Sequence, residues 1–343
     1  MDSRDVAGLL LLTVATACGA RTALPSEGNG ADDGAAGSAS SSGGAPSCTL
    51  TIDATAIVTS LVAEGERIYY VSTKGRVMAA DADTGATTLL AQIPAQLLNT
   101  PIALALDVDS LYLTFVGEND SRPDLWRIPK AGGVPEHIAS GDIDNVFVDD
   151  AGLYWTDRLS PQLKHEVFRR RPDGTALSLG VIDDSYYEMR GIYRGTAGLL
   201  APSLTALLAF DIEGAGATTL SDAKHVSFPF ERDGALFFNV GYGTPHGLLR
   251  TSLDGTMAQQ LYEGPFERVI TDGVSWVFTS PFEQERDIFG ASYPDGELSF
   301  VYHSPTSTTP RAVALTPTRL VLGAGYWEFE VGIQSLCRDA LGL

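Results

Sequence analysis

Short apolar runs alternate with polar turns along most of this chain, and each run has the length of a β-strand. Leu104–Leu106 and Val146–Val148 are such runs, and an acid follows each of them, Asp107 and Asp149. A second run then mixes apolar and aromatic residues, as in Leu111-Tyr112-Leu113. Continuous apolar runs of this length predict strands buried on both faces, so the pattern predicts an all-β chain.

The same unit recurs seven times. Aligned on the first core residue of the second strand, the copies lie 37 to 46 residues apart, at Ile68, Leu111, Leu153, Leu199, Leu236, Trp276 and Leu320. A glycine marker keeps the same phase, at Gly85, Gly133, Gly174, Gly214, Gly255 and Gly296. Most of these glycines close Asp-Gly or Gly-Gly turns, which supply the positive φ of a tight hairpin. This period predicts a seven-bladed β-propeller, with six or eight blades as alternatives.

Two residue types recur within the units. The acids that follow the first strands are predicted to cap the turns through backbone N–H groups rather than to bind metal: Glu64, Asp107, Asp149, Asp233 and Asp272. The aromatic residues of the second strands are predicted to pack between blades, where a large side chain buries the most area.

One unit carries a family motif. Leu153-Tyr154-Trp155-Thr156-Asp157 contains Tyr-Trp-Thr-Asp, and the other units are degenerate copies of it. This resembles the YWTD-type propeller repeat of low-density-lipoprotein-receptor ectodomains. The chain resembles bacterial envelope propellers more closely, because Arg127-Ile128-Pro129-Lys130-Ala131-Gly132-Gly133 matches their basic-Pro-x-x-Gly turn. The resemblance spans residues 49–340 and implies the fold alone, with no ligand or catalytic residue.

The N-terminus predicts a membrane anchor. Residues 1–17 carry an apolar run from Val6 to Ala17 that is too short to span a bilayer and has the length of a signal-peptide core. The small residues before Cys18 resemble a bacterial lipobox, which implies that Cys18 is diacylated. The alternative is an ordinary signal peptide cut near Ala17 or Ala20. Residues 18–47, rich in Gly, Ala and Ser, are predicted to form a disordered tether of roughly 30 Å root-mean-square length.

The two remaining cysteines bracket the repeat region, residues 48–343. The last unit runs out of strands, and Cys48–Ile52 can supply the missing outer strand. A Cys48–Cys337 disulfide would then lock the ring closed in an oxidising compartment, and two buried free thiols are the alternative.

Charge limits the partners. The formal net charge is −20, so nucleic acid and anionic membrane surfaces are poor partners for the domain. The repeat region is long enough for one propeller, which we expect to be a monomer. No motif points to a cofactor, and the five histidines show no metal-ligand spacing, so we expect neither a cofactor nor a metal.

A site is expected where the second strands connect to the third, because these loops are long: Val116–Asp124, Asp157–Glu166, Val240–Gly247 and Ser280–Asp287. Four basic residues precede the first strands of units four to seven and are predicted to form an anion-binding rim at the channel mouth: Arg190, His225, Arg268 and Arg311. The alternative is that they pair with neighbouring acids such as Glu188 and Glu267 and tie the blades together.

Other candidates are weaker. Ser221–Lys224 matches Ser-x-x-Lys without its partner motifs, and Asp81–Gly85 is predicted to be a turn rather than a calcium loop. Trp327 is predicted to lie in a loop of the last unit, packed locally or exposed to a sugar or peptide.

These observations predict a lipid-anchored propeller of the bacterial cell envelope, on the outer membrane. Its expected role is non-catalytic binding or scaffolding for a protein partner or an envelope glycan. No residue is assigned a catalytic role. The alternative is a hydrolase or lyase whose site lies at the channel mouth, since fold does not choose function.

Overall fold

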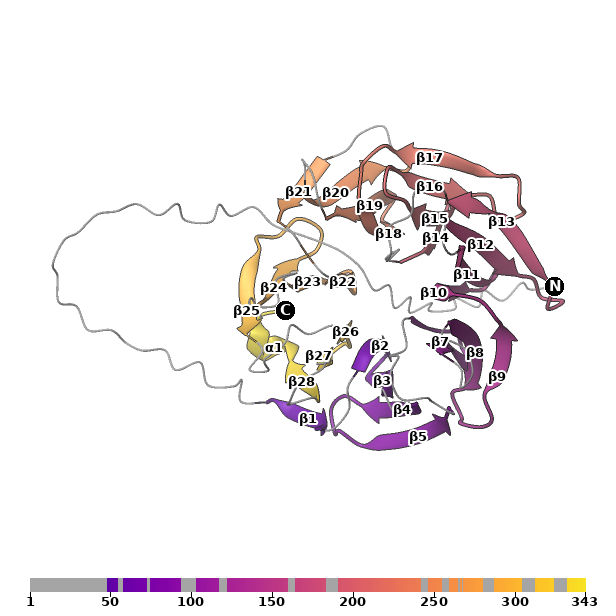
Figure 1. The fold of residues 1–343 in the computed structure, drawn as a ribbon. Helices are drawn as coiled ribbons and strands as arrows, with labels where there is room; N and C mark the ends of the chain where they lie inside the picture. Colours follow the sequence, from indigo (N-terminus) through magenta and orange to yellow (C-terminus); the bar gives the residue numbers. More distant parts are fainter. Residues whose placement is uncertain are drawn as a thin grey trace, which may run out of the picture.

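The structure is a computed structural model. It describes residues 48–54, 58–72, 75–93, 103–116, 122–159, 164–182, 191–241, 246–254, 259–264, 266, 268–279, 287–303, 312–323 and 332–343. These residues form seven four-stranded antiparallel sheets around a central axis (Figure 1). The predicted seven-bladed propeller is confirmed, and the alternatives of six or eight blades are wrong.

Each blade runs outward from the axis through four strands. Blade 1 consists of β2 (Val58–Glu64), β3 (Arg67–Ser72), β4 (Arg76–Asp81) and β5 (Thr87–Gln92). Blade 2 consists of β6 (Leu104–Leu106), β7 (Ser110–Val116), β8 (Pro123–Pro129) and β9 (Glu136–Ala139). Blade 3 consists of β10 (Ile143–Asp149), β11 (Gly152–Leu159), β12 (Lys164–Arg170) and β13 (Ala176–Ile182).

The next three blades repeat this order. Blade 4 consists of β14 (Tyr193–Gly195), β15 (Gly198–Pro202), β16 (Leu207–Phe210) and β17 (Ala217–Ser221). Blade 5 consists of β18 (Val226–Arg232), β19 (Ala235–Val240), β20 (Gly247–Ser252) and β21 (Gln259–Glu263). Blade 6 consists of β22 (Arg268–Thr271), β23 (Ser275–Thr279), β24 (Asp287–Ser292) and β25 (Ser299–His303).

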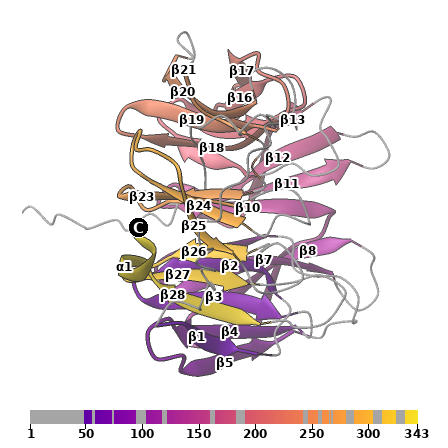
Figure 2. The same cartoon turned by 90° about the vertical axis from the view of Figure 1, so that its left-hand side faces the viewer.

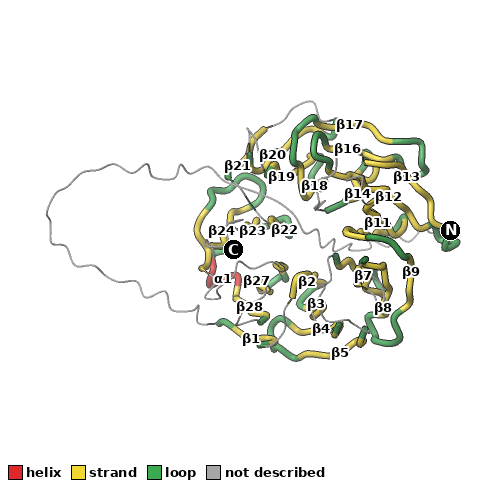
Figure 3. The backbone as a smooth tube through the Cα atoms, in the orientation of Figure 1, coloured by secondary structure: helices red, strands yellow, loops and turns green. Residues whose placement is uncertain are grey.

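Blade 7 is built from both ends of the repeat region. Its inner strands are β26 (Ala312–Leu315), β27 (Arg319–Gly323) and β28 (Ile333–Cys337), and its outer strand is β1 (Leu50–Asp53). The helix α1 (Arg338–Leu341) follows β28 and is the only helix among the described residues (Figure 3). Nowhere in this part of the chain is a helix long and apolar enough to cross a bilayer.

The repeat anchors all lie in second strands, and all seven are buried. Blades pack on one another through the large side chains of these strands, as predicted. Trp276 of blade 6 is fully buried, and its ring lies 5.7 Å from that of Phe237 and 6.0 Å from that of Phe230, both in blade 5. Burial of aromatic surface between sheets is therefore the main stabilising contact between these blades.

The first strands differ from the prediction. Val146, Phe147 and Val148 of β10 are only half-buried, although their continuous apolar run predicts burial on both faces. The physical reason is their position, because β10 lies next to the propeller axis and no further strand covers its inner edge (Figure 1).

The ring closes in blade 7, as predicted. Leu50 pairs with Ser335 and Thr51 with Gln334, which makes β1 the outer neighbour of β28. A disulfide joins Cys48 to Cys337. Two hydrogen bonds extend the closure to blade 1: the Tyr70 hydroxyl donates to Asp53 Oδ2 at 3.1 Å and the Ser335 hydroxyl to the Ala82 carbonyl at 2.7 Å.

The propeller has two different faces. At the turn face, first strands turn directly into second strands, as at Asp150-Ala151 between β10 and β11. At the opposite loop face, second strands connect to third strands and the chain crosses between blades. Figure 2 shows the propeller from the side, with α1 and the C-terminus at one edge. Because α1 follows the end of a third strand, that edge is the turn face.

Candidate functional site

The turn face is occupied by its own hydrogen bonds. Asp107 Oδ1 accepts the backbone N–H groups of Asp109 and Ser110 at 2.8 and 2.7 Å. Asp149 and Asp272 make equivalent pairs of bonds to the turns that follow them. These three acids cap turns as predicted. Glu64 instead binds side chains, and Asp233 adopts a φ of 49° within its turn.

Ion pairs at the turn face join neighbouring blades. Lys130 of blade 2 lies 2.6 Å from Glu64 of blade 1. Further pairs join blades 3 and 4, blades 7 and 1, and blade 6 and α1: Arg169–Glu213, Arg319–Asp83 and Arg338–Asp272. These four ion pairs therefore help to hold the ring together.

The pKa of Asp272 reflects the hydrogen bonds and the ion pair that this carboxylate makes. Burial opposes its ionisation, but the backbone N–H groups of Ser275 and Val274 and the Arg338 guanidinium outweigh burial, so its pKa is lowered. Arg338 is itself buried and also donates to the Thr316 carbonyl at 2.8 Å.

The loop face carries the densest buried polar network of blade 3. Asp144 of β10 accepts hydrogen bonds from the Thr156 hydroxyl at 2.5 Å, the Asn145 side-chain amide at 3.1 Å and His165 Nε2 at 2.7 Å. Asn145 Oδ1 in turn accepts the backbone N–H of Gly191, in the segment that crosses to blade 4, at 3.0 Å. The network therefore fixes three strands of blade 3 and the start of the next blade.

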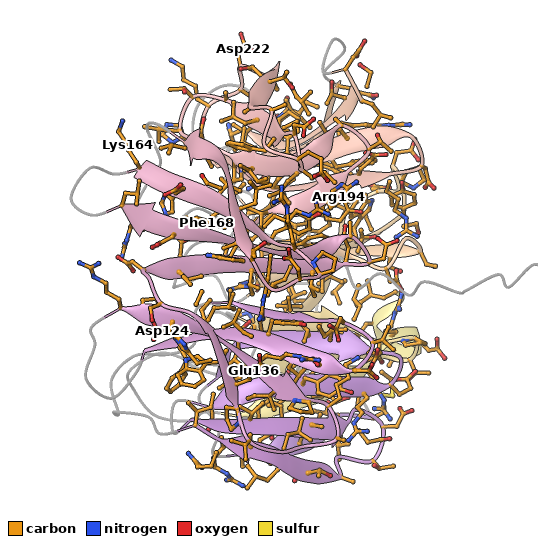
Figure 4. All side chains as sticks on the ribbon, turned by 90° about the vertical axis from the view of Figure 1, so that its right-hand side faces the viewer. Asp124, Glu136, Lys164, Phe168, Arg194 and Asp222 are labelled. Atoms are coloured by element: carbon orange, nitrogen blue, oxygen red, sulfur yellow. A yellow bond between two sulfur atoms is a disulfide. The ribbon has the colours of Figure 1, made fainter. Side chains whose placement is uncertain are left out.

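Beside this network lies a second group of charges. Arg158 binds both carboxylate oxygens of Asp142, at 2.9 and 3.0 Å. Asp157, the acid of the Tyr-Trp-Thr-Asp motif, accepts the backbone N–H of Asp142 at 2.7 Å. Burial raises the pKa of Asp157, and the negative charges of Asp142 and Glu166 raise it further. In Figure 4, Lys164 and Asp124 lie toward this edge of the propeller and Arg194 toward the opposite edge.

Neither histidine–aspartate arrangement of this region has the geometry of an active site. His165 has no exposed surface and Asp144 is only 9% exposed, so this pair is buried within the blade. On the outer part of blade 2, His137 Nε2 lies 3.1 Å from Asp124 Oδ2 and 3.2 Å from Ser140 Oγ. Both partners use the same ring nitrogen, so the aspartate cannot orient the ring for proton transfer from the serine.

The predicted anion rim is described only in part. Arg190 and Arg311 lie outside the described residues. The His225 backbone N–H donates to the Leu204 carbonyl and the His225 carbonyl accepts from Gly241, while Arg268 is the first residue of β22, opposite Thr279. Both residues make further interactions within the protein. The rim therefore stays a prediction.

Two of the weaker candidates, Asp81–Gly85 and Ser221–Lys224, are a turn and a blade crossing. Asp81 Oδ1 accepts the backbone N–H groups of Asp83 and Thr84, so Asp81–Gly85 is the predicted turn. Ser221 ends β17, and the rest of Ser221–Lys224 crosses to blade 5. Trp327 and the central residues of the four predicted long loops lie outside the described residues. In the described part of the chain, no three His, Cys, Asp or Glu side chains are grouped to hold a metal ion.

Blade 4 is a blade for which no long loop was predicted. Its second and third strands are joined by a tight turn, in which the Ser203 backbone N–H donates to the Ala206 carbonyl at 2.8 Å and the Ser203 hydroxyl oxygen accepts the Ala206 N–H at 2.9 Å. The connections between second and third strands at the loop face therefore differ in length from blade to blade.

Sequence reasoning missed the Asp144–His165 pair, because the alternation that marks His165 as buried is visible in the structure and not in the residue types of β12. Along β12 buried and half-buried positions alternate, and His165 has the same parity as the buried Val167 and Arg169. Alternation of this kind places every second side chain inside the blade, so a polar residue at that parity requires a buried partner.

Comparisons with known proteins agree on the fold. No protein-family model matches the chain, and no curated protein matches it significantly. Among solved structures, the WD40 β-propeller domain of Doa1 is similar at 15% identity and a TM-score of 0.62, over 86% of this chain and 98% of that one.

Two further solved structures are similar at this level. YCF48 bound to D1 peptide matches at 10% identity and a TM-score of 0.59, over 84% of this chain and 96% of that one. The computationally designed Ika8 protein matches at 14% identity and a TM-score of 0.51, over 82% and 83%. At these identities the likeness shows the β-propeller fold.

Proposed function

We propose that this protein is a lipid-anchored, non-catalytic binding or scaffold protein of the bacterial cell envelope, which holds a protein partner or an envelope glycan on its loop face. The observation that carries the proposal is the difference between the two faces. At the turn face four ion pairs join blades or join α1 to blade 6, whereas the long connections and the blade crossings lie at the loop face. Such segments on a rigid scaffold are where binding residues concentrate.

The position of Cys48 also favours the loop face as the binding face. Cys48 is linked to Cys337, which ends β28 at the turn face, and Arg319 Nη1 donates to the Cys48 carbonyl at 3.1 Å. Cys48, the first described residue, therefore lies at the turn face. With an anchor at Cys18, the turn face is the one nearer the membrane attachment and the loop face is free for a partner.

A peptide is a reasonable first ligand class. The structurally similar YCF48 is bound to D1 peptide in its solved structure, which shows that a propeller of this shape accommodates a peptide. The hydrolase or lyase alternative lacks support among the described residues, because the histidine–aspartate pair nearest the channel is buried.

Site-directed crosslinking on intact envelopes tests the proposed face. A photo-crosslinking amino acid replaces the exposed Asp222 at the loop face or, as the matched control, the exposed Glu297 at the turn face. We expect a discrete crosslinked product from position 222 and none from position 297. A product from position 297 alone would assign the partner to the wrong face and contradict the proposal.

The anchor is tested separately. Replacing Cys18 with alanine removes the thiol that carries the lipid, so incorporation of a labelled fatty acid should stop and the protein should leave the membrane fraction. Fractionation and labelling of cells that make the full chain give the answer. Equal labelling of the alanine variant would show that Cys18 is not lipidated.

A further inference from the structure

Strained backbone gathers in or beside β18, the first strand of blade 5. In the part of the chain that the structure describes, the residues other than glycine with a positive φ are His225 at 55°, Phe228 at 51° and Asp233 at 49°. Asp233 lies in the turn to β19, where an aspartate adopts this conformation readily. A phenylalanine within a strand does not, because its side chain is bulky. Strain of this kind clusters at sites that bind or react.

A bulge carries Phe228 in this conformation. Ser227 pairs with Asn239 and Phe230 with Phe237, so β18 has one residue more than β19 over this stretch. Such bulges re-aim a side chain. β18 is the strand of blade 5 nearest the axis (Figure 1), and Phe228 is its third residue after the crossing from blade 4. Phe228 therefore lies at the loop-face end of the propeller axis.

Phe228 is half-buried and packs against none of the hydrophobic clusters formed by the described residues. Its ring lies along the backbone of Gly191, in the segment that enters blade 4, because a Cβ built on Gly191 would lie 3.4 Å from Phe228 Cδ1. Phe147, the half-buried phenylalanine of β10, has ring partners in Tyr154 and Tyr193. The exposed part of Phe228 has no such partner and is available to a ligand.

Two hydrogen-bonding groups beside Phe228 are also not used within the described structure. Asn239 Nδ2 donates to Ser227 Oγ at 3.2 Å and to the Phe266 carbonyl at 3.3 Å. Because Ser227 Oγ accepts this bond, its own proton remains to be donated, and no described residue accepts it. Asn239 is 1% exposed, and its Oδ1 accepts no hydrogen bond from the described residues. A buried acceptor without a donor lowers stability, and a ligand that supplies the donor removes this cost.

Blade 3 shows a bulge whose polar groups are satisfied from within the protein. Its first strand, β10, also has a bulge at the loop-face end, and the extra residue there is Asp144. Asp144 accepts hydrogen bonds from three neighbouring side chains, and Asn145 Oδ1 accepts the backbone N–H of Gly191. Blade 3 therefore uses its bulge to hold blades together, whereas the bulge of blade 5 leaves an aromatic ring and two polar groups unused.

The unused groups match a short, uncharged stretch of peptide. A peptide offers carbonyl and N–H groups in succession, a carbonyl for the Ser227 hydroxyl and an N–H for Asn239 Oδ1, which lies next to that hydroxyl on the same side-chain amide. An apolar side chain of the peptide offers a surface for the Phe228 ring. A sugar carries a hydroxyl on nearly every carbon, and two polar groups would leave most of those hydroxyls buried without a partner.

We propose that the loop face binds an uncharged peptide segment at β18, with a proline of the segment against Phe228 and its peptide groups hydrogen-bonded to Ser227 and Asn239. This rests on the proposed binding function and names the chemistry of the partner. Proline suits the position because its rigid ring loses little conformational entropy when it stacks against an aromatic side chain.

The test measures the binding of a fluorescent, end-blocked peptide of alternating proline and glycine to the full chain in detergent, by fluorescence anisotropy. Phe228→Gly should weaken binding by about tenfold or more, which is the loss typical of a central aromatic contact. Phe300→Ala is the matched control, because Phe300 is an exposed phenylalanine of the outer strand β25, and it should leave the affinity unchanged. A peptide of alternating serine and glycine, which lacks the apolar side chain, should bind severalfold more weakly.

The same position separates a binding role of the ring from a packing role. Glycine adopts a φ of 51° without strain, so Phe228→Gly should leave the thermal unfolding midpoint unchanged or raise it. A phenylalanine that serves only the core would lower the midpoint when it is removed. Phe228→Tyr keeps the aromatic ring and should retain the affinity of the wild type. A midpoint that falls on Phe228→Gly, or an affinity that Phe228→Tyr does not retain, would overturn the inference.

The outcome is separable from that of the proposed function. A crosslinked partner at position 222 together with no binding of the proline–glycine peptide would refute the inference and leave the binding function standing. An oligosaccharide of N-acetylglucosamine that binds, and that loses affinity on Phe228→Gly, would also refute the peptide and would favour an envelope glycan as the ligand.

Discussion

Replacing both Cys48 and Cys337 with serine should lower the thermal unfolding midpoint of the protein by roughly 8 °C without preventing folding. The disulfide joins positions 289 residues apart, and closing so long a loop in the unfolded chain stabilises the folded state by up to roughly 5 kcal/mol. Folding should survive because β1 remains hydrogen-bonded to β28 and Tyr70 to Asp53. Differential scanning calorimetry of the two proteins measures the shift.

Reduction supplies the control. A reducing agent should lower the midpoint of the wild-type protein to that of the double serine variant and leave the variant unchanged. An identical midpoint for wild type and variant under oxidising conditions would mean that the bridge does not stabilise the ring.

Asp144→Ala should be the most destabilising single substitution at the loop face, at roughly 3–5 kcal/mol, because it removes the only carboxylate of a buried network. Three donors would lose this acceptor at once: the Thr156 hydroxyl, His165 Nε2 and the Asn145 amide, of which the amide also donates to Thr156 Oγ1. Each is buried, so water cannot replace the lost bond without opening the blade. Denaturant unfolding followed by tryptophan fluorescence measures the loss, since Trp155 lies in the same blade.

A matched substitution separates the effect of burial on stability from the effect of the hydrogen bond itself. Asp287 makes a histidine hydrogen bond of the same 2.7 Å length, but both side chains are partly exposed. Asp287→Ala should therefore cost under about 1 kcal/mol. Equal losses for the two variants would show that the Asp144 network is not what fixes blade 3.

The sequence was sufficient for the architecture because the architecture is periodic. Apolar anchors such as Leu111 and Leu153 recur at every second strand, and a repeat of this length has few other ways to bury them. The outer strand was predictable for a related reason, since the last unit lacked one strand and Cys48–Ile52, which overlaps the observed β1 (Leu50–Asp53), was the segment left over.

The polar contacts were less predictable because they depend on register between blades. Asp272 and Arg338 are 66 residues apart and meet only because α1 turns back over blade 6. Asp144 pairs with His165 on β12, two strands away, and no local sequence pattern predicts this pairing. The burial of first strands was overestimated for a similar reason, because an apolar run does not reveal that its inner edge faces an axis.

The sharing of blade 7 between the two ends of the repeat region has a consequence for biogenesis. Six blades are continuous in sequence and can each form as soon as their own residues are available, whereas blade 7 needs Leu50–Asp53 and Ile333–Cys337 together. During synthesis the ring therefore stays open until nearly the whole chain has emerged, with β1 and the blade 1 surface unpaired. The newly made protein is most open to proteases and aggregation in this interval, so a chaperone that covers one of these two surfaces should raise its yield.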